Sequence, residues 1–206
     1  MNNHKRVPFE ITHQRKNSTF SNIFTTILAV IGSIGVAILL NLFVFQSYYV
    51  DGESMSPTLH TDNRLIISKI ERTFTRLGTT SYIPQRGQIV VLSGKVSPST
   101  ATQAPELIKR VIGIPGDTLT IKNGVVTIKN STSAEFNVDT LLGLTLDPTY
   151  SEEFTINIPE GKVFVLGDNR TRGGSLDSRS FGLVDASLID GRLWARIMPF
   201  SQRRVF

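Results

Sequence analysis

The feature that most limits how this chain can fold is a long stretch without charge near its N-terminus. No Asp, Glu, Lys or Arg occurs from Asn17 to Val50, and residues 23–45 are dominated by Ile, Leu, Val, Phe and Ala. A helix needs about 20 such residues to cross the apolar core of a bilayer. A cleaved leader has a shorter apolar region of about 7 to 15 residues. We therefore predict one retained membrane-spanning helix over residues 22–47, rather than a cleaved leader or a buried core helix.

The charges on either side of this stretch predict its direction. Asp51 and Glu53 follow it, whereas Glu10 alone opposes the four cations that precede it, Lys5, Arg6, Arg15 and Lys16. Membrane proteins keep an excess of Lys and Arg on the cytoplasmic side. We expect residues 1–21 to form a cytoplasmic basic tail and residues 48–206 to lie outside the plasma membrane.

Composition narrows the classes of partner and of chemistry. The net charge is +5, from 22 Lys and Arg against 17 Asp and Glu, but no compact basic run interleaved with aromatic residues follows the tail. This distribution favours the lipid bilayer over nucleic acid as the anionic partner. The absence of cysteine excludes thiol proteases, disulfides and thiolate metal sites. His60 is the one histidine beyond the tail, so a multi-histidine metal site is excluded and no metal or cofactor is expected.

After the apolar stretch the chain is predicted to be mostly β. Short apolar runs alternate with turn signals, and no long segment carries a helical stripe. Asn123-Gly124 tolerates the positive φ angles of a tight hairpin turn. Segments 93–105 and 130–153 are expected to be loops or insertions. The candidate strands are residues 64–69, 88–92, 107–114, 118–122, 125–129, 162–166 and 191–197.

Three segments concentrate residues capable of chemistry. The first, residues 51–59, is consistent with a plain turn, but it can also present Ser54 with its backbone N–H free to face a developing oxyanion. In the second, residues 106–117, side chains alternate between the two faces of a strand, so Lys109 would share a face with Leu107 and Val111. Its ammonium either reaches solvent or is buried, and burial lowers the pKa of a lysine.

The third segment, residues 165–182, follows an apolar strand and combines acids, arginines and hydroxyls. It is either a solvated loop or a set of internal ion pairs, and its arginines disfavour a calcium site. A Ser/His/Asp triad would have to use His60, only six positions after Ser54. Without cysteine or another external histidine, a serine nucleophile needs a lysine, and Lys109 is the lysine set among apolar residues.

Together the three segments resemble the type I signal peptidase family, bacterial leader peptidases with a Ser/Lys dyad, and especially its members with a single anchor. Residues 54–59 match a Ser-Met-x-Pro-Thr-Leu motif, and residues 109–117 match Lys-Arg-x-x-Gly-x-Pro-Gly-Asp. Residues 167–170 with 177–179 match Gly-Asp-Asn-Arg followed by Asp-Ser-Arg. The resemblance implies a β protease domain with a small inserted β subdomain, here at about residues 130–159.

The resemblance also implies a function and a set of site residues. A membrane-bound serine endopeptidase would cleave signal peptides from exported preproteins after small residues at −1 and −3. Ser54 would be the nucleophile and Lys109 the general base. Met55, Leu59 and Ile108 would help to line an apolar substrate pocket. A charge-paired structural scaffold would consist of Arg110, Asp168, Asp177 and Arg179.

Two departures from the family pattern affect the site. Many members carry Ser or Thr two positions before the nucleophile, where this chain has Gly52, so the oxyanion hole would depend on the Ser54 backbone N–H and the Gly52 region. The third motif is two residues longer than in familiar members. A serine is expected to orient Lys109, and we predict Ser175 rather than Ser178 because its spacing to Asp177 matches the family.

Two other functions remain open at this stage. A specialised processing peptidase, such as one that matures pilins, would carry the same dyad. A membrane-tethered β module without activity would bind partners outside the cell.

Overall fold

In the computed structural model, residues 18–78, 82–96 and 105–206 are described, and they divide into two units, with the boundary between Leu40 and Asn41. The basic tail predicted at residues 1–21 lies mainly outside the described residues, as does most of the loop predicted at 93–105.

The first element is a long apolar helix, α1 (Ser18–Phe43). Its segment Asn22–Leu40, 19 residues long, has the length and composition of a membrane span. The helix ends earlier than predicted, because Phe45, Gln46 and Ser47 belong to strand β1 (Phe45–Tyr49). Phe45 pairs with Ser68 of β2. Hydropathy cannot mark this boundary, since the strand is as free of charge as the helix before it.

Residues after α1 confirm the predicted mostly β fold, in two sheets whose described strand pairs are all antiparallel. The larger sheet has the order β1-β2-β11-β3-β4-β9-β10, with β12 beside β11, and the smaller has the order β7-β6-β5-β8. After β1, the strands of the larger sheet are β2 (Arg64–Ser68), β3 (Ile89–Leu92), β4 (Leu107–Gly113), β9 (Lys162–Leu166), β10 (Val184–Asp185), β11 (Ile189–Met198) and β12 (Arg204–Val205). Those of the smaller are β5 (Thr118–Lys122), β6 (Val125–Lys129), β7 (Phe136–Asn137) and β8 (Phe154–Asn157).

Short helices connect the strands. They are α2 (Ile70–Leu77), α3 (Val138–Leu141) and α4 (Ser178–Phe181), with single 3₁₀ turns at Gly94–Val96, Ala186–Leu188 and Phe200–Gln202. All seven predicted strands are present, with ends that shift by at most two residues. The predicted hairpin turn is confirmed, because Asn123 and Gly124 have φ angles of 50° and 76°.

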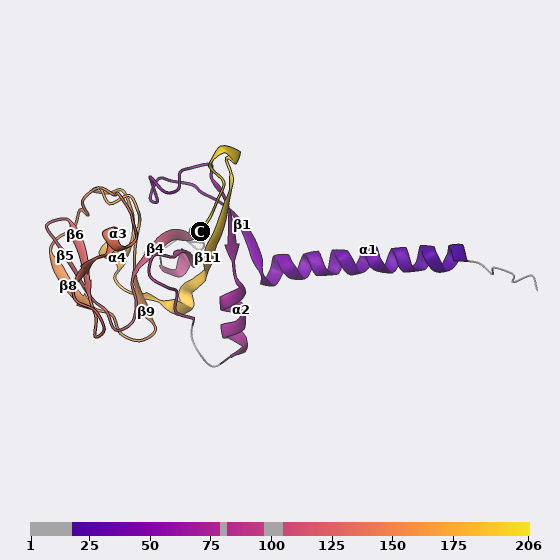
Figure 1. Ribbon diagram of the computed structural model, residues 1–206, viewed down its shortest axis with the longest axis horizontal. Helices are drawn as coiled ribbons and strands as arrows, with labels where there is room; N and C mark the ends of the chain where they lie inside the picture. The colour runs from indigo at the N-terminus through magenta and orange to yellow at the C-terminus, as the bar shows by residue number, and fades with distance from the viewer. Residues whose placement is uncertain (1–17, 79–81, 97–104) are drawn as a thin grey trace, which may run out of the picture. The chain divides into compact units, whose positions relative to one another are not determined.

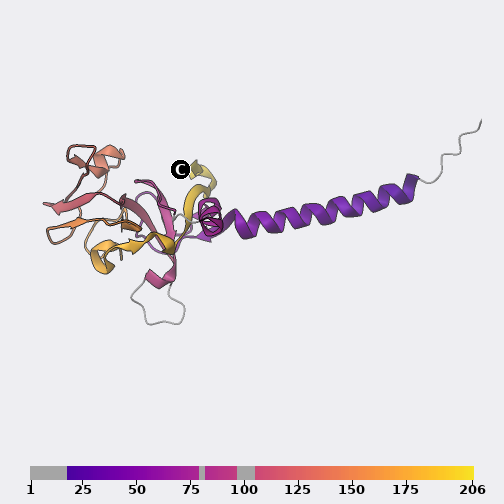
Figure 2. The ribbon, with the colours of Figure 1, turned by 90° about the horizontal axis from the view of Figure 1, so that it is seen from below.

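The smaller sheet begins earlier than the predicted insertion. Its first strand, β5, starts at Thr118, directly after β4 and a turn, and its last, β8, ends at Asn157. The sheet lies at the end of residues 41–206 away from β1, as both views of the ribbon show (Figures 1 and 2). The inserted subdomain therefore includes the β5–β6 hairpin, and its core reaches Phe164 and Leu166 of β9.

Strand β3 lies at the centre of the larger sheet and is buried on both faces. Ile89 and Val91 pack in one cluster with residues of the loop that follows β1, whereas Val90 and Leu92 pack in another with β9 and β10. Because β4 is hydrogen-bonded to β3 along this buried edge, the side chains of β4 enter the interior on both faces.

Candidate active site

The loop of residues 50–63, between β1 and β2, presents Ser54. Its base is closed by Val50 N–H, which donates to Asn63 O at 3.0 Å, and by Asp62 N–H, which donates to Val50 O at 3.1 Å. Met55 and Leu59 are buried in the core below the loop. These apolar anchors on one side of the loop fix the position of Ser54.

Strand β4 places two adjacent cations on opposite faces of the sheet. Lys109 has 2% of its surface exposed and Arg110 has 7%. Arg110 binds the Asp168 carboxylate through Nε at 2.8 Å and Nη2 at 2.5 Å. Among the described residues, Lys109 has no carboxylate within ion-pair distance. The fold therefore neutralises the charge of Arg110 and leaves the Lys109 amine without a counter-ion.

The Lys109 amine instead contacts the candidate nucleophile. Its Nζ lies 2.8 Å from Ser54 Oγ and 2.8 Å from Ile108 O. Burial lowers the pKa of Lys109 from 10.5 to about 8, because desolvation outweighs the opposing effect of the Asp177 and Asp168 carboxylates, and Arg179 lowers it further. Near neutral pH a useful fraction of this amine is unprotonated and can accept a proton from a hydroxyl.

The loop after β9 supports Ser54 from the other side. Asn169 donates from its backbone N–H to Ser54 O at 3.1 Å and from Nδ2 to Glu53 O at 3.2 Å. A Cβ atom on Gly167 would lie 2.3 Å from both Ser54 O and Ser175 Oγ, a distance that only glycine permits. The backbone at Gly167 therefore packs directly against the nucleophile segment.

The two candidate orienting serines have different environments. Ser178 Oγ accepts a hydrogen bond from Val165 N–H at 3.0 Å in the interior. Ser175 Oγ is buried beside Gly167 and has no hydrogen-bond partner among the described residues. The expected bond between Lys109 and Ser175 is therefore not formed in this arrangement, in which Nζ contacts Ser54 Oγ and Ile108 O. Ser178 already has a structural role.

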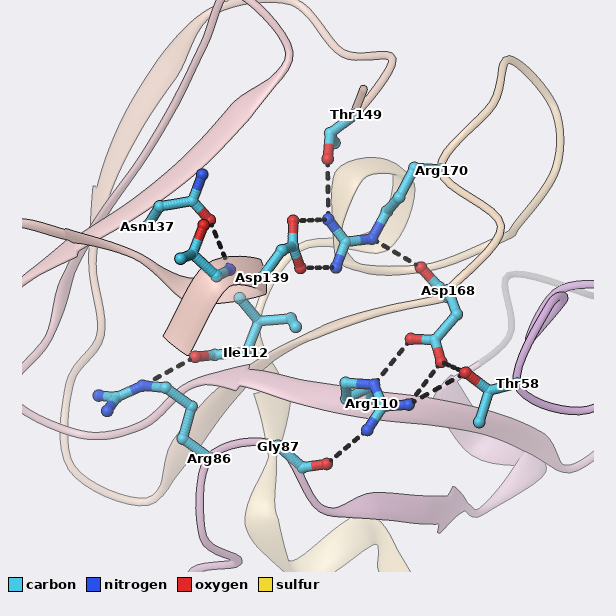
Figure 3. A network of polar contacts seen from close by, with 12 residues as sticks. Thr58, Arg86, Gly87, Arg110, Ile112, Asn137, Asp139, Thr149, Asp168 and Arg170 are labelled. Atoms are coloured by element: carbon cyan, nitrogen blue, oxygen red, sulfur yellow. Dashed lines mark hydrogen bonds and ion pairs between the residues drawn. The ribbon is translucent and has the colours of Figure 1, made fainter. Parts of the chain in front are cut away.

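The four residues expected to form a charge scaffold pair as two buried units. Thr58 Oγ1 adds a hydrogen bond of 2.5 Å to the Asp168 carboxylate that Arg110 holds (Figure 3). Asp177 binds Arg179 through both oxygens and also accepts from Gly167 N–H at 2.9 Å. The first pair thus joins the loop after β9 to β4 and to the Ser54 loop, whereas the second braces the segment between β9 and β10 internally.

The sequence interpretation missed a third buried cation, Arg170. It is fully buried and binds both oxygens of Asp139 at 2.7 and 2.9 Å, together with Thr149 Oγ1 and Gly167 O (Figure 3). Arg170 belongs to the third motif, and this position indicated that it has a role in the fold or the site. Its partners could not be predicted, because they lie in a segment with no recognisable sequence pattern.

A pocket of about 280 Å³ lies beside Ser54 and Lys109. Three residues were expected to line the substrate pocket. Met55 and Ile108 line this pocket, whereas Leu59 is fully buried in the core and is not part of its wall. Tyr48 also lines the pocket, and burial together with the nearby Glu106 carboxylate raises its pKa.

Two backbone N–H groups were expected near the oxyanion. The Gly52 N–H donates to Thr61 Oγ1 at 3.1 Å and is therefore already used. For the Ser54 N–H, no acceptor is found among the described parts of the chain. His60, the alternative base, has its Nδ1 2.9 Å from Glu53 Oε2, so its ring is engaged with a carboxylate.

Comparison with known proteins identifies the family. A model of the signal peptidase, peptidase S26 family matches residues 23–198. Signal peptidase I of Bacillus licheniformis is 30% identical over 94% of this chain and 98% of its own, and signal peptidase I T of Bacillus subtilis (strain 168) is 31% identical over 99% and 98%. The crystal structure of a signal peptidase I from Enterococcus faecalis V583 shares 30% identity, covering 55% of this chain and 99% of that chain with a TM-score of 0.39. From the extent of the family match and the near-complete coverage of these relatives, the chain belongs to the signal peptidase family of hydrolases, peptidase S26.

Proposed function

We propose that this chain is a membrane-bound serine endopeptidase that removes N-terminal signal peptides from exported preproteins, with Ser54 as nucleophile and Lys109 as general base. The observation that carries the proposal is the 2.8 Å contact between Lys109 Nζ and Ser54 Oγ. It occurs where the lysine is buried without a carboxylate partner in the described structure. Family membership supports the class of substrate.

The first half of the reaction is acylation. Neutral Lys109 accepts the proton of Ser54 Oγ as that oxygen attacks the carbonyl carbon of the scissile peptide bond. The Ser54 N–H, which has no acceptor in the described parts of the chain, would donate to the oxyanion that forms. Lys109 then gives the proton to the departing amine, and the signal peptide stays bound to Ser54 as an ester.

The second half is deacylation. Lys109, again neutral, accepts a proton from a water molecule that attacks the ester carbonyl, and returns it to Ser54 Oγ as the ester bond breaks. Ser175 would orient the lysine during these transfers, and its buried hydroxyl, which has no partner among the described residues, supports this role.

The pocket beside the dyad supports a preference for small residues at −1 and −3. An extended substrate would share this volume of about 280 Å³ among several of its residues, so each of them would have little room. Met55 and Ile108 give this wall an apolar character. An extended substrate segment lying along the pocket would place small side chains toward it and larger ones away from it.

The proposed location follows from α1. Asn22–Leu40 would cross the plasma membrane, with the N-terminal tail in the cytoplasm and the catalytic domain outside, where exported preproteins emerge. Signal peptides and the bilayer are the proposed partners, and nucleic acid is not.

The test uses the full chain in mild detergent with a panel of preproteins, and mass spectrometry of the new N-termini. Cleavage after small residues at −1 and −3 is expected from the parent, and complete loss is expected from Ser54→Ala and from Lys109→Ala, because each removes a group that binding cannot replace. Matched controls are Ser201→Ala and Lys129→Ala, whose side chains are exposed. Normal turnover by either dyad variant would refute the assignment.

A further inference from the structure

The buried Arg170 connects two parts of the fold that the proposed chemistry treats separately. On one side, its guanidinium donates hydrogen bonds to Asp139 of α3 and to Thr149, which both belong to the stretch between β7 and β8 of the smaller sheet. On the other side its Nε donates to Gly167 O, in the loop after β9, at 2.9 Å. We call these four residues the Arg170 latch.

The latch is costly to open. Arg170 is fully buried, and the side chain of Asp139 is 19% exposed. A buried cation that loses its carboxylate keeps the cost of desolvation without compensation. The loop after β9 can therefore hold Arg170 in this position only while the inserted subdomain supplies Asp139.

The loop that the latch holds is the one that touches the nucleophile. Gly167 approaches Ser54 O so closely that no Cβ would fit, and Asn169 N–H donates to the same oxygen. Lys109 is held mainly by its strand, because β4 pairs with β3 on one edge and with β9 on the other, and the segment 167–170 reaches it only through the bond between Asp168 and the neighbouring Arg110. A shift of the segment 167–170 would thus act directly on Ser54, through the Asn169 bond, whereas the pairing of β4 with β3 would restrain Lys109, so the distance between the two side chains would change.

We propose that Asp139 is a positioning residue, through which the inserted subdomain fixes the distance between Ser54 and Lys109. This inference rests on the proposed function of the dyad. It assigns to the insertion a part in the reaction, which a merely variable surface segment would not have.

The test is Asp139→Asn in the full chain in detergent, compared with Glu71→Gln. The control makes the same carboxylate-to-amide change in an ion pair, with Arg192, that has no contact with the latch. Because displacement of a catalytic group by about 1 Å can cost about 100-fold in rate, Asp139→Asn should lower kcat by at least about 10-fold while KM changes less than about 2-fold. Glu71→Gln should leave both unchanged, and Asp139→Glu should recover part of kcat.

A second measurement separates positioning from mere stability. Amide hydrogen exchange of the peptide containing residues 167–170 should be faster in Asp139→Asn, under conditions where the strands β3 and β4 exchange as in the parent. Unchanged exchange of this peptide, or a loss of kcat explained entirely by the unfolded fraction, would overturn the proposal. If the parent itself neither cleaves preproteins nor labels at Ser54, the proposed function fails, whereas the exchange result still decides whether the latch exists.

Discussion

Replacing Lys109 with Met should abolish cleavage and at the same time make the protein more stable. The lysine is 2% exposed and has no carboxylate partner in the described structure, so the fold carries the cost of burying a cation at any pH where the amine is protonated. Methionine fills a similar volume without charge, and it keeps the apolar contacts of the stem.

The size and pH range of the effect follow from the pKa of Lys109. A decrease from 10.5 to about 8 is 2.5 units, which at about 1.36 kcal/mol per unit corresponds to about 3 kcal/mol. Below pH 8 both folded and unfolded states hold the proton, and the folded state carries this cost in full. Between about pH 8 and 10.5 the unfolded state binds the proton that the folded state has lost, so the stability of the parent rises with pH.

The assay is urea unfolding of the full chain in one detergent at pH 7, 8, 9 and 10, followed by fluorescence of Trp194, the sole tryptophan. Lys109→Met should exceed the parent by up to about 3 kcal/mol at pH 7, and the difference should shrink toward pH 10. Tyr48 and Tyr82, whose pKa values are raised, destabilise both proteins above about pH 10 and cancel in the difference. Lys129→Met, on the surface, should stay within about 0.5 kcal/mol of the parent. A difference that is constant from pH 7 to 10, or a variant less stable than the parent at pH 7, would contradict the reasoning.

Three further predictions concern the reaction and the topology. The acidic limb of kcat/KM should have its midpoint near pH 8, because neutral Lys109 is required, and His60→Ala should leave it in place; a shift of the limb in that variant would instead identify the histidine as base. Ser175→Ala should lower kcat without destabilising the fold, whereas Ser178→Ala should leave the Val165 N–H unsatisfied and cost about 1 to 3 kcal/mol in the free energy of unfolding. Single-turnover kinetics and urea unfolding of both variants test this, and a larger loss of kcat in Ser178→Ala than in Ser175→Ala would contradict it. Protease added to intact cells should digest the domain after Tyr49 and spare the basic tail, as immunoblots against each end can show, and the opposite pattern would reverse the proposed orientation.

Elements whose signals are local could be predicted from the sequence. The β5–β6 hairpin depends on Asn123 and Gly124, and the period of two in its strands is visible in the residues themselves. Strand β1 could not be found in this way, because it continues the apolar run of α1 and is defined by its pairing with β2. The short helix α2 was missed for a similar reason, since its eight residues are too few to establish a helical period.

The residues of the candidate site also differ in whether a local sequence signal predicts them. Ser54 and Lys109 are 55 residues apart, yet each belongs to a recognisable motif. Their pairing could be predicted because the sequence offers few other bases for a serine nucleophile. The partnership of Arg170 with Asp139 depends on where the inserted subdomain docks, and nothing in the residues around Asp139 indicates a partner. The free hydroxyl of Ser175 likewise depends on the packing around Gly167, which only the folded chain reveals.

Strand β4 is buried on both faces, and successive side chains of a strand point to opposite faces. The environment of each β4 side chain therefore depends on whether its position is odd or even. Lys109 and Arg110 differ by one step along the strand, and that step decides which of them meets Ser54 and which meets Asp168. If the strand slipped by one residue so that Arg110 took the place of Lys109, a guanidinium, which cannot act as a base in proteins, would face the serine. Val111 would then take the place of Arg110, and the buried Asp168 carboxylate would lose the guanidinium that neutralises it. A single deletion in β4 that shifts the strand in this way would thus remove the base from Ser54 and the counter-ion from Asp168, although both side chains are still in the chain. Active variants of this chain should therefore tolerate changes of length at the β5–β6 hairpin turn but not within β4.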